Sequence, residues 1–110
     1  MAGSLEGKRV AFLMANEGVE QVELTEPWKA VQSAGGEPVL LAPEPGEVQA
    51  FNHLDKGDRF PVHVTVGDAD PEEFDALVLP GGVANPDQLR IKPPAVHFVH
   101  QLAESGRPIA

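Results

Sequence analysis

Two features of the sequence could take part in chemistry: the carboxylic acid Glu23 and the glycine pair Gly81–Gly82. Glu23 follows the apolar run Val10–Ala15 after a short polar segment, and the glycine pair follows the apolar run Ala76–Leu79 and a proline. Consecutive glycines allow positive φ and leave backbone N–H groups unshielded, so they suit a tight loop. If both runs are parallel strands, their carboxyl ends meet where α/β sheets bind ligands. The sequence therefore predicts that Glu23 lies next to the glycine loop.

Both features also have an ordinary structural explanation. A Pro-Gly-Gly sequence is typical of a plain strand-to-helix connection. Glu20 and Glu23 precede an expected helix, whose dipole stabilises carboxylates without any role in catalysis. His97 and His100 have a spacing that can hold a metal, but no third ligand stands at a suitable position. We therefore expect these histidines on a solvated helix face, and we expect neither a metal site nor a cofactor.

The composition limits the classes of protein that the chain can belong to. It has 110 residues, 42% of them hydrophobic, which is enough for one domain with a modest core. A formal net charge of −9 disfavours nucleic acid or an anionic membrane surface as a partner. No apolar stretch approaches membrane-spanning length, and Met1–Lys8 lacks the apolar region of a signal peptide, so we expect a cytoplasmic protein. There is no cysteine, which excludes disulfides and thiolate ligands within these residues.

Three apolar runs predict parallel strands: Val10–Ala15, Pro38–Ala42 and Ala76–Leu79. None of them alternates with polar residues, as expected when helices cover both faces of a sheet. We place the first run at the centre of the sheet. The predicted fold is α/β, a doubly wound parallel sheet with helices on both faces.

The segment between the first two strands predicts a helix that runs to about Ala34. Gly35–Gly36 is expected to end it, since glycine readily adopts the left-handed conformation after a helix. Pro27 cannot donate a helical hydrogen bond, so it either lies in the first turn, with Thr25 as a possible N-cap, or marks a kink. Three apolar residues share one face of this helix: Leu24, Trp28 and Val31.

A small antiparallel excursion is expected between the second and third strands. Val48–Phe51 starts it, and Phe60–Val66 alternates valine with polar residues, which indicates a half-exposed antiparallel element. Asp70–Glu73 then has an N-cap, a proline at N1 and an acid at N3, which predict a short helix.

The last helix is expected between Pro93–Pro94 and Ser105–Gly106. Its inward side chains are predicted to be Val96, Val99, Leu102 and Ala103. Arg107–Ala110 then begins another strand. We therefore expect residues 8–110 to form the N-terminal part of a single domain that continues beyond residue 110, and residues 1–7 to form a flexible terminus.

Four blocks of the sequence occur in a recognisable order: Ala15–Leu24, Glu72–Gly82, Pro86–Arg90 and Gly106–Ala110. As a set they resemble the DJ-1/PfpI family, in particular its PfpI-like and general-stress-protein branch, and the resemblance spans residues 8–110. The Leu-Pro-Gly-Gly sequence alone is shared with the wider class I glutamine amidotransferase-like superfamily. The resemblance implies a flavodoxin-like fold of that superfamily.

The resemblance also implies a role for each candidate residue. The family has a nucleophilic cysteine followed by histidine, on a sharp turn after the strand that Arg107–Ala110 begins. Glu23 corresponds to the acid that hydrogen-bonds the cysteine sulfur, and it can donate only when protonated. Gly81 and Gly82 correspond to the residues whose N–H groups bind an oxyanion. Asp87 stands where PfpI-like members supply Glu or Asp to the histidine of a neighbouring subunit, which implies a homodimer or a higher homo-oligomer.

The function implied by the resemblance is that of a stress-response enzyme with a cysteine nucleophile. Its substrates would be reactive carbonyls, their adducts or peptides, handled by glyoxalase III, deglycase or peptidase chemistry. One alternative is a redox sensor or holdase chaperone, in which the cysteine is oxidised without turnover. Another is a glutamine amidotransferase-like subunit, which is disfavoured because that class lacks the sequence block around Glu23.

Overall fold

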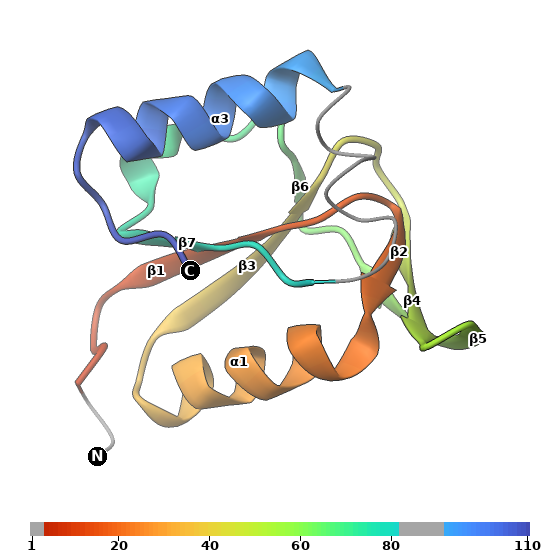
Figure 1. The fold of residues 1–110 in the computed structure, drawn as a ribbon. Helices are drawn as coiled ribbons and strands as arrows, with labels where there is room; N and C mark the ends of the chain where they lie inside the picture. Colours follow the sequence, from red (N-terminus) through yellow and green to blue (C-terminus); the bar gives the residue numbers. More distant parts are fainter. Residues whose placement is uncertain (1–3, 82–91) are drawn as a thin grey trace.

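The computed structural model describes residues 4–81 and 92–110. Its central sheet has four strands in the order β6-β3-β1-β7, all parallel. Their bounds are β1 Arg9–Leu13, β3 Glu37–Ala42, β6 Val64–Thr65 and β7 Ala76–Val78. Helix α1 (Gln21–Ser33) covers one face of this sheet and α3 (Pro93–Glu104) the other (Figure 1). The predicted doubly wound α/β sheet, with its first strand in the interior, is confirmed.

The core has two halves, one on each face of the sheet, and β1 contributes to both. Phe12 packs with the buried residues of α1, whereas Leu13 packs with the buried residues of α3. Because successive side chains of a strand point to opposite faces, a strand between two helical layers needs apolar residues at every position. This explains why the sequence of β1 does not alternate.

The predicted antiparallel excursion is present as a hairpin of β4 (Glu47–Asn52) and β5 (Asp55–Pro61), but its second strand lies earlier than the predicted Phe60–Val66. Two features of this region differ from the prediction. Glu17–Glu20 forms strand β2, which pairs in parallel with β4 and completes a three-stranded sheet. The valine alternation after Pro61 does not continue the hairpin, because Val64–Thr65 (β6) joins β3 in parallel at the edge of the central sheet.

Helix α1 begins directly after β2, earlier than Pro27 suggested. Its N-cap residue is Glu20, which makes no side-chain cap, so the prediction of Thr25 as N-cap is wrong and Pro27 lies inside the helix. The end of the helix is as predicted. The Gly35 N–H bonds to the Gln32 carbonyl at 3.0 Å, the next N–H bonds to the Val31 carbonyl at 2.9 Å, and Gly35 has a φ of 89°. This is a Schellman motif, which needs a left-handed residue at that position.

The inward face of α3 differs from the prediction by one residue. Leu102 is buried as predicted and Val99 packs partly buried against the core, but the other buried side chains are Ala95 and Phe98. Val96 is 50% exposed and Ala103 is exposed. The ring of Phe98 packs edge-on against Phe74, with centroids 5.8 Å apart. The large aromatic side chain thus determines which of two overlapping helical periodicities faces the core.

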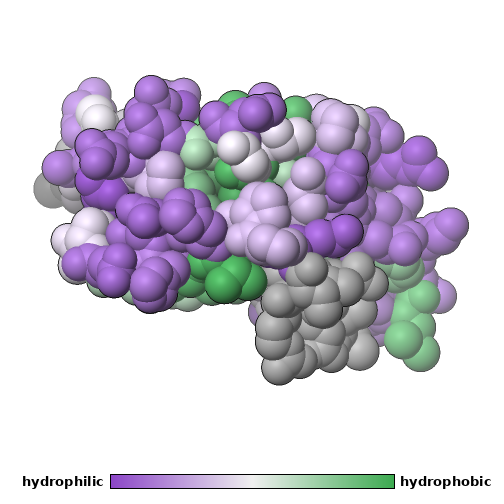
Figure 2. Space-filling model, turned by 90° about the horizontal axis from the view of Figure 1, so that it is seen from above, coloured by the Kyte–Doolittle hydropathy of each residue, from purple (hydrophilic) through white to green (hydrophobic). Residues whose placement is uncertain are grey.

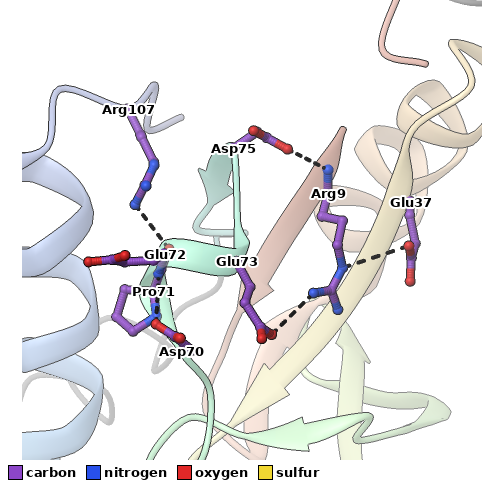
Figure 3. Close-up of polar contacts among 8 residues, drawn as sticks. All are labelled: Arg9, Glu37, Asp70, Pro71, Glu72, Glu73, Asp75 and Arg107. Carbon is purple, nitrogen blue, oxygen red and sulfur yellow. Dashed lines mark hydrogen bonds and ion pairs between the residues drawn. The ribbon is translucent and has the colours of Figure 1, made fainter. Parts of the chain in front are cut away.

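Polar contacts hold the start of β7 beside β1 (Figure 3). The Arg9 N–H donates to Asp75 Oδ2 at 2.9 Å, and the Asp75 N–H donates to the Arg9 carbonyl at 2.8 Å. The guanidinium of Arg9 pairs with Glu73 at 3.3 Å and lies over the Phe74 ring, 4.8 Å from its centroid. These contacts fix the register of β7, and so they fix where the loop after β7 leaves the sheet.

The 3₁₀ helix η1 (Pro71–Glu73) precedes β7, and Asp70 caps it by accepting from the Glu72 N–H at 3.0 Å. Arg107 donates to the Pro71 carbonyl at 3.0 Å, which ties the segment after α3 to this turn (Figure 3). The short helix start predicted from the sequence is therefore present as a single 3₁₀ turn.

The segment after α3 lies along the free edge of β7. Leu77 forms a parallel bridge with Ile109, and the Ala110 N–H bonds to the Leu77 carbonyl at 2.9 Å. Viewed from above α3, the molecule is covered mainly by hydrophilic residues (Figure 2). No helix within the described ranges is long and apolar enough to cross a membrane.

Candidate functional site

Glu23 and Gly81 lie against each other at the carboxyl end of the central sheet. Glu23 is the third residue of α1, and Gly81 follows the loop that leaves β7. A Cβ built on Gly81 would lie 2.9 Å from Glu23 Cδ and would overlap Glu23 Oε1. The carboxylate therefore occupies the space that any larger residue at position 81 would fill. The predicted proximity of the acid and the glycine loop is present in the structure.

Close approach, and not an unusual backbone conformation, explains the glycine at position 81. Gly81 is not among the glycines with positive φ, so it does not use the positive φ that glycine allows. Its carbonyl accepts the N–H of Glu20 at 2.8 Å. That hydrogen bond joins the start of α1 to the loop after β7, and it holds Glu23 one turn further along the helix beside the same loop.

Glu23 is exposed in the part of the chain that the structure describes. It lies in the first turn of α1, where the unpaired N–H groups and the helix dipole favour negative charge. Pro27 lies four residues further on and has no N–H to donate to the Glu23 carbonyl. The arrangement brings a carboxyl group, a helix N-terminus and the glycine at position 81 into one small region.

A hairpin that the sequence did not connect with this site is tethered to the same end of α1. The Glu20 carboxylate accepts the N–H of His53, at the hairpin turn, at 3.0 and 3.2 Å. The Gln21 side chain makes two hydrogen bonds to Asp58 of β5, at 2.7 and 3.0 Å. Glu20 thus contacts both the hairpin and Gly81. No local pattern predicts these contacts, because the partners are more than 30 residues apart in sequence.

Two of the predicted site residues, Gly82 and Asp87, lie outside the described residues. His97 and His100 are exposed on α3, and His100 Nδ1 lies 3.7 Å from Glu104. Within the part of the chain that the structure describes, no group of three or more potential ligands could hold a metal ion.

The fold and the site together define a flavodoxin-like α/β protein with an acid at the first helix facing a glycine loop on the adjacent strand. The sequence profile of the DJ-1/PfpI family matches residues 8–110. The chain belongs to the DJ-1/PfpI family.

Similar proteins include two with a stated activity. The chain is 37% identical to a deglycase of Pyrococcus horikoshii and 35% identical to the deglycase PfpI of Pyrococcus furiosus. Each match covers 93% of this chain but only 58% of the relative. A two-domain protein of Anabaena variabilis, with a DJ-1/ThiJ/PfpI-like and a ferritin-like domain, has 32% identity and a TM-score of 0.82. That match covers 93% of this chain and 28% of the Anabaena protein.

Proposed function

We propose that this protein acts on reactive carbonyl compounds or on their adducts with other molecules, by cysteine-dependent chemistry of the deglycase type. The observation that carries the proposal is the contact of Glu23 with Gly81 at the carboxyl end of the central sheet. Two relatives at 35–37% identity are named deglycases, which supports this reaction class over the peptidase alternative.

The chain contains no cysteine, so the proposal assigns the nucleophile to the protein beyond residue 110. The segment that ends at Ala110 is hydrogen-bonded along β7, and Gly81 follows the end of β7. A strand continued from Ala110 in this direction would bring its carboxyl end to the region of Glu23 and Gly81, because neighbouring parallel strands end at the same edge.

The site residues would then act in the following way. A thiolate adds to the carbonyl carbon of the substrate, the C=O π bond becomes a C–O⁻ group, and the N–H groups of Gly81 and Gly82 stabilise that oxyanion. Glu23, when protonated, donates a hydrogen bond to the sulfur and holds it in position. Asp87 of a neighbouring subunit orients the histidine that follows the cysteine, so that the active form is a homodimer or a higher homo-oligomer.

The test measures thiol reactivity and turnover in the full-length protein with three substitutions at one position. Glu23→Gln keeps a hydrogen-bond donor, Glu23→Asp withdraws the carboxyl by one methylene, and Glu23→Leu removes it. The rate of alkylation by iodoacetamide is measured against pH. We expect the curve of Glu23→Gln to lie nearest to wild type, that of Glu23→Asp further away, and that of Glu23→Leu furthest. Removal of one positioned donor typically lowers kcat by about 10²-fold to 10³-fold.

Consumption of methylglyoxal and release of free amine from its adducts give the activity. Alkylation curves that superimpose for wild type and Glu23→Leu would leave Glu23 only a structural role at the helix start. Reversible peroxide oxidation of the thiol without turnover of either substrate would favour the redox-sensor alternative and overturn the proposal. If the site is shared between subunits, Asp87→Asn should lower the activity. A monomer of the wild-type protein that keeps full activity would exclude a contribution from the neighbouring subunit.

A further inference from the structure

A groove of about 330 Å³ is lined by one side of α1, by Leu40 of β3, by the end of β5 and by His63. Its lining is mainly apolar, and its principal side chains are Leu24, Trp28, Lys29, Leu40, Phe60 and His63. Glu23 and Gly81, both described, are not among the lining residues. Its volume lies at the lower end of the range of about 300–1,000 Å³ that is typical of small-molecule sites.

Trp28 lines the groove, and a core residue packs against its ring. Phe12, which is fully buried, packs against it with centroids 5.0 Å apart. On another side the His63 ring lies 5.7 Å away and is tilted by 47°. Trp28 itself is half-buried, so part of the indole faces the groove. A ligand ring beside Trp28 and His63 can adopt the tilted or offset contacts that aromatic pairs favour.

A backbone contact determines which nitrogen of His63 can serve a ligand. The Leu40 N–H donates to His63 Nδ1 at 2.9 Å, and the His63 N–H donates to the Leu40 carbonyl at 3.0 Å. Because Nδ1 accepts a hydrogen bond, the neutral imidazole carries its proton on Nε2. The ring nitrogen of His63 that can contact a ligand is therefore Nε2, and it is a hydrogen-bond donor.

The charge of the groove is opposite to that of the whole molecule. The chain has 17 acidic residues and a net charge of −9, yet none of the described lining residues is acidic. Lys29 is the cation of the lining, with its side chain 72% exposed. Its Nζ lies 4.0 Å from Glu26, an exposed pair of a kind that contributes little and that a ligand can replace.

We propose that this groove binds a small aromatic carboxylate. The ring lies against Trp28 and Phe60, and the carboxylate accepts from Lys29 Nζ and from His63 Nε2. An amine would meet the lysine with like charge, and a neutral alcohol would lose the ionic contact. The expected order of affinity is therefore carboxylate, then alcohol, then amine.

The experiment titrates the full-length protein with 4-phenylbutyrate, 4-phenylbutan-1-ol and 4-phenylbutylamine. Heat of binding gives the affinity, and quenching or a shift of tryptophan emission locates the ligand, since Trp28 is the only tryptophan of these 110 residues. Trp28→Phe assigns the optical signal. At the ligand efficiency of a drug-sized molecule, a probe with about 12 heavy atoms binds with a Kd of about 2 mM.

Lys29→Gln is expected to weaken the acid by about two- to fivefold and to leave the alcohol unchanged, as for an exposed ion pair. Lys56→Gln, on β5 and outside the groove lining, is the matched control and should change neither. Three results would overturn the proposal. The first is that the acid shows no saturable binding below about 10 mM. The second is that the amine binds at least as tightly as the acid. The third is that Trp28 emission changes with protein concentration alone, because a second copy covers the groove.

Discussion

Replacing Gly81 with alanine should disable Glu23 without unfolding the protein. The new Cβ would lie 2.9 Å from Glu23 Cδ, whereas carbon atoms in contact stand about 3.5–4.0 Å apart, so the carboxyl must move by roughly 1 Å. A displacement of this size at a reacting group can lower turnover by about 10²-fold. Glu23 is exposed and can rotate into solvent, so the free energy of unfolding should change by less than about 1 kcal/mol.

The assay compares kcat/KM for methylglyoxal adducts with the midpoint of urea unfolding, for wild type, Gly81→Ala, Glu23→Leu and the double variant. Because both changes act through one side chain, their effects on kcat/KM should not add. Gly67→Ala is the matched control, since its Cβ would meet Pro94 only at an ordinary 3.8 Å. Full activity of Gly81→Ala would refute the reasoning, as would fully additive losses in the double variant.

Three further predictions concern the fold and are read from equilibrium unfolding or hydrogen exchange. Phe98→Ala should lower the free energy of unfolding by about 3–5 kcal/mol, because the ring is fully buried. Val96→Ala, at a side chain that is 50% exposed, should change it by no more than about 0.5 kcal/mol. Equal losses in the two variants would contradict the observed face of α3. Gly35→Ala should cost about 1 kcal/mol, because its φ of 89° favours glycine, and an unchanged midpoint would contradict the Schellman motif. Glu20→Ala should speed exchange of the His53 amide by about tenfold, while Glu20→Gln keeps an acceptor and should retain part of the protection; wild-type exchange in Glu20→Ala would show that the contact is not maintained in solution.

The elements that sequence predicted well are those whose pattern has a single physical cause. β1 and β7 lack alternation because helices cover both faces, and Gly35 ends α1 because only a left-handed residue continues the chain there. The position of Glu23 beside Gly81 follows from the same rule, since neighbouring parallel strands present their carboxyl ends together. The chemical roles of these two residues remain predictions.

The elements that sequence did not predict depend on contacts between distant residues. β2 is short and acidic, and only its pairing with β4 makes it a strand. On α3, the stripe of Val96 and Val99 has the same spacing as the stripe of Ala95 and Phe98, so periodicity alone could not select the buried one. Pro27 alone did not decide where α1 starts, since a proline marks either a first turn or a kink. In the structure β2 delivers the chain directly into this helix, and Pro27 lies inside it.

Helix α1 contributes to both proposed sites, and its packing allows the two to be tested separately. Glu23 contacts Gly81, while Trp28 lines the groove on the side facing Leu40. The buried side chains of Leu24 and Val31 hold the helix against the sheet, so a surface substitution at either site leaves its position unchanged. The effects of substitutions at Glu23 and Lys29 on kcat/KM, and on the affinity for the aromatic acid, should therefore be additive. Coupling between the two would mean that α1 moves as a unit when one site is filled.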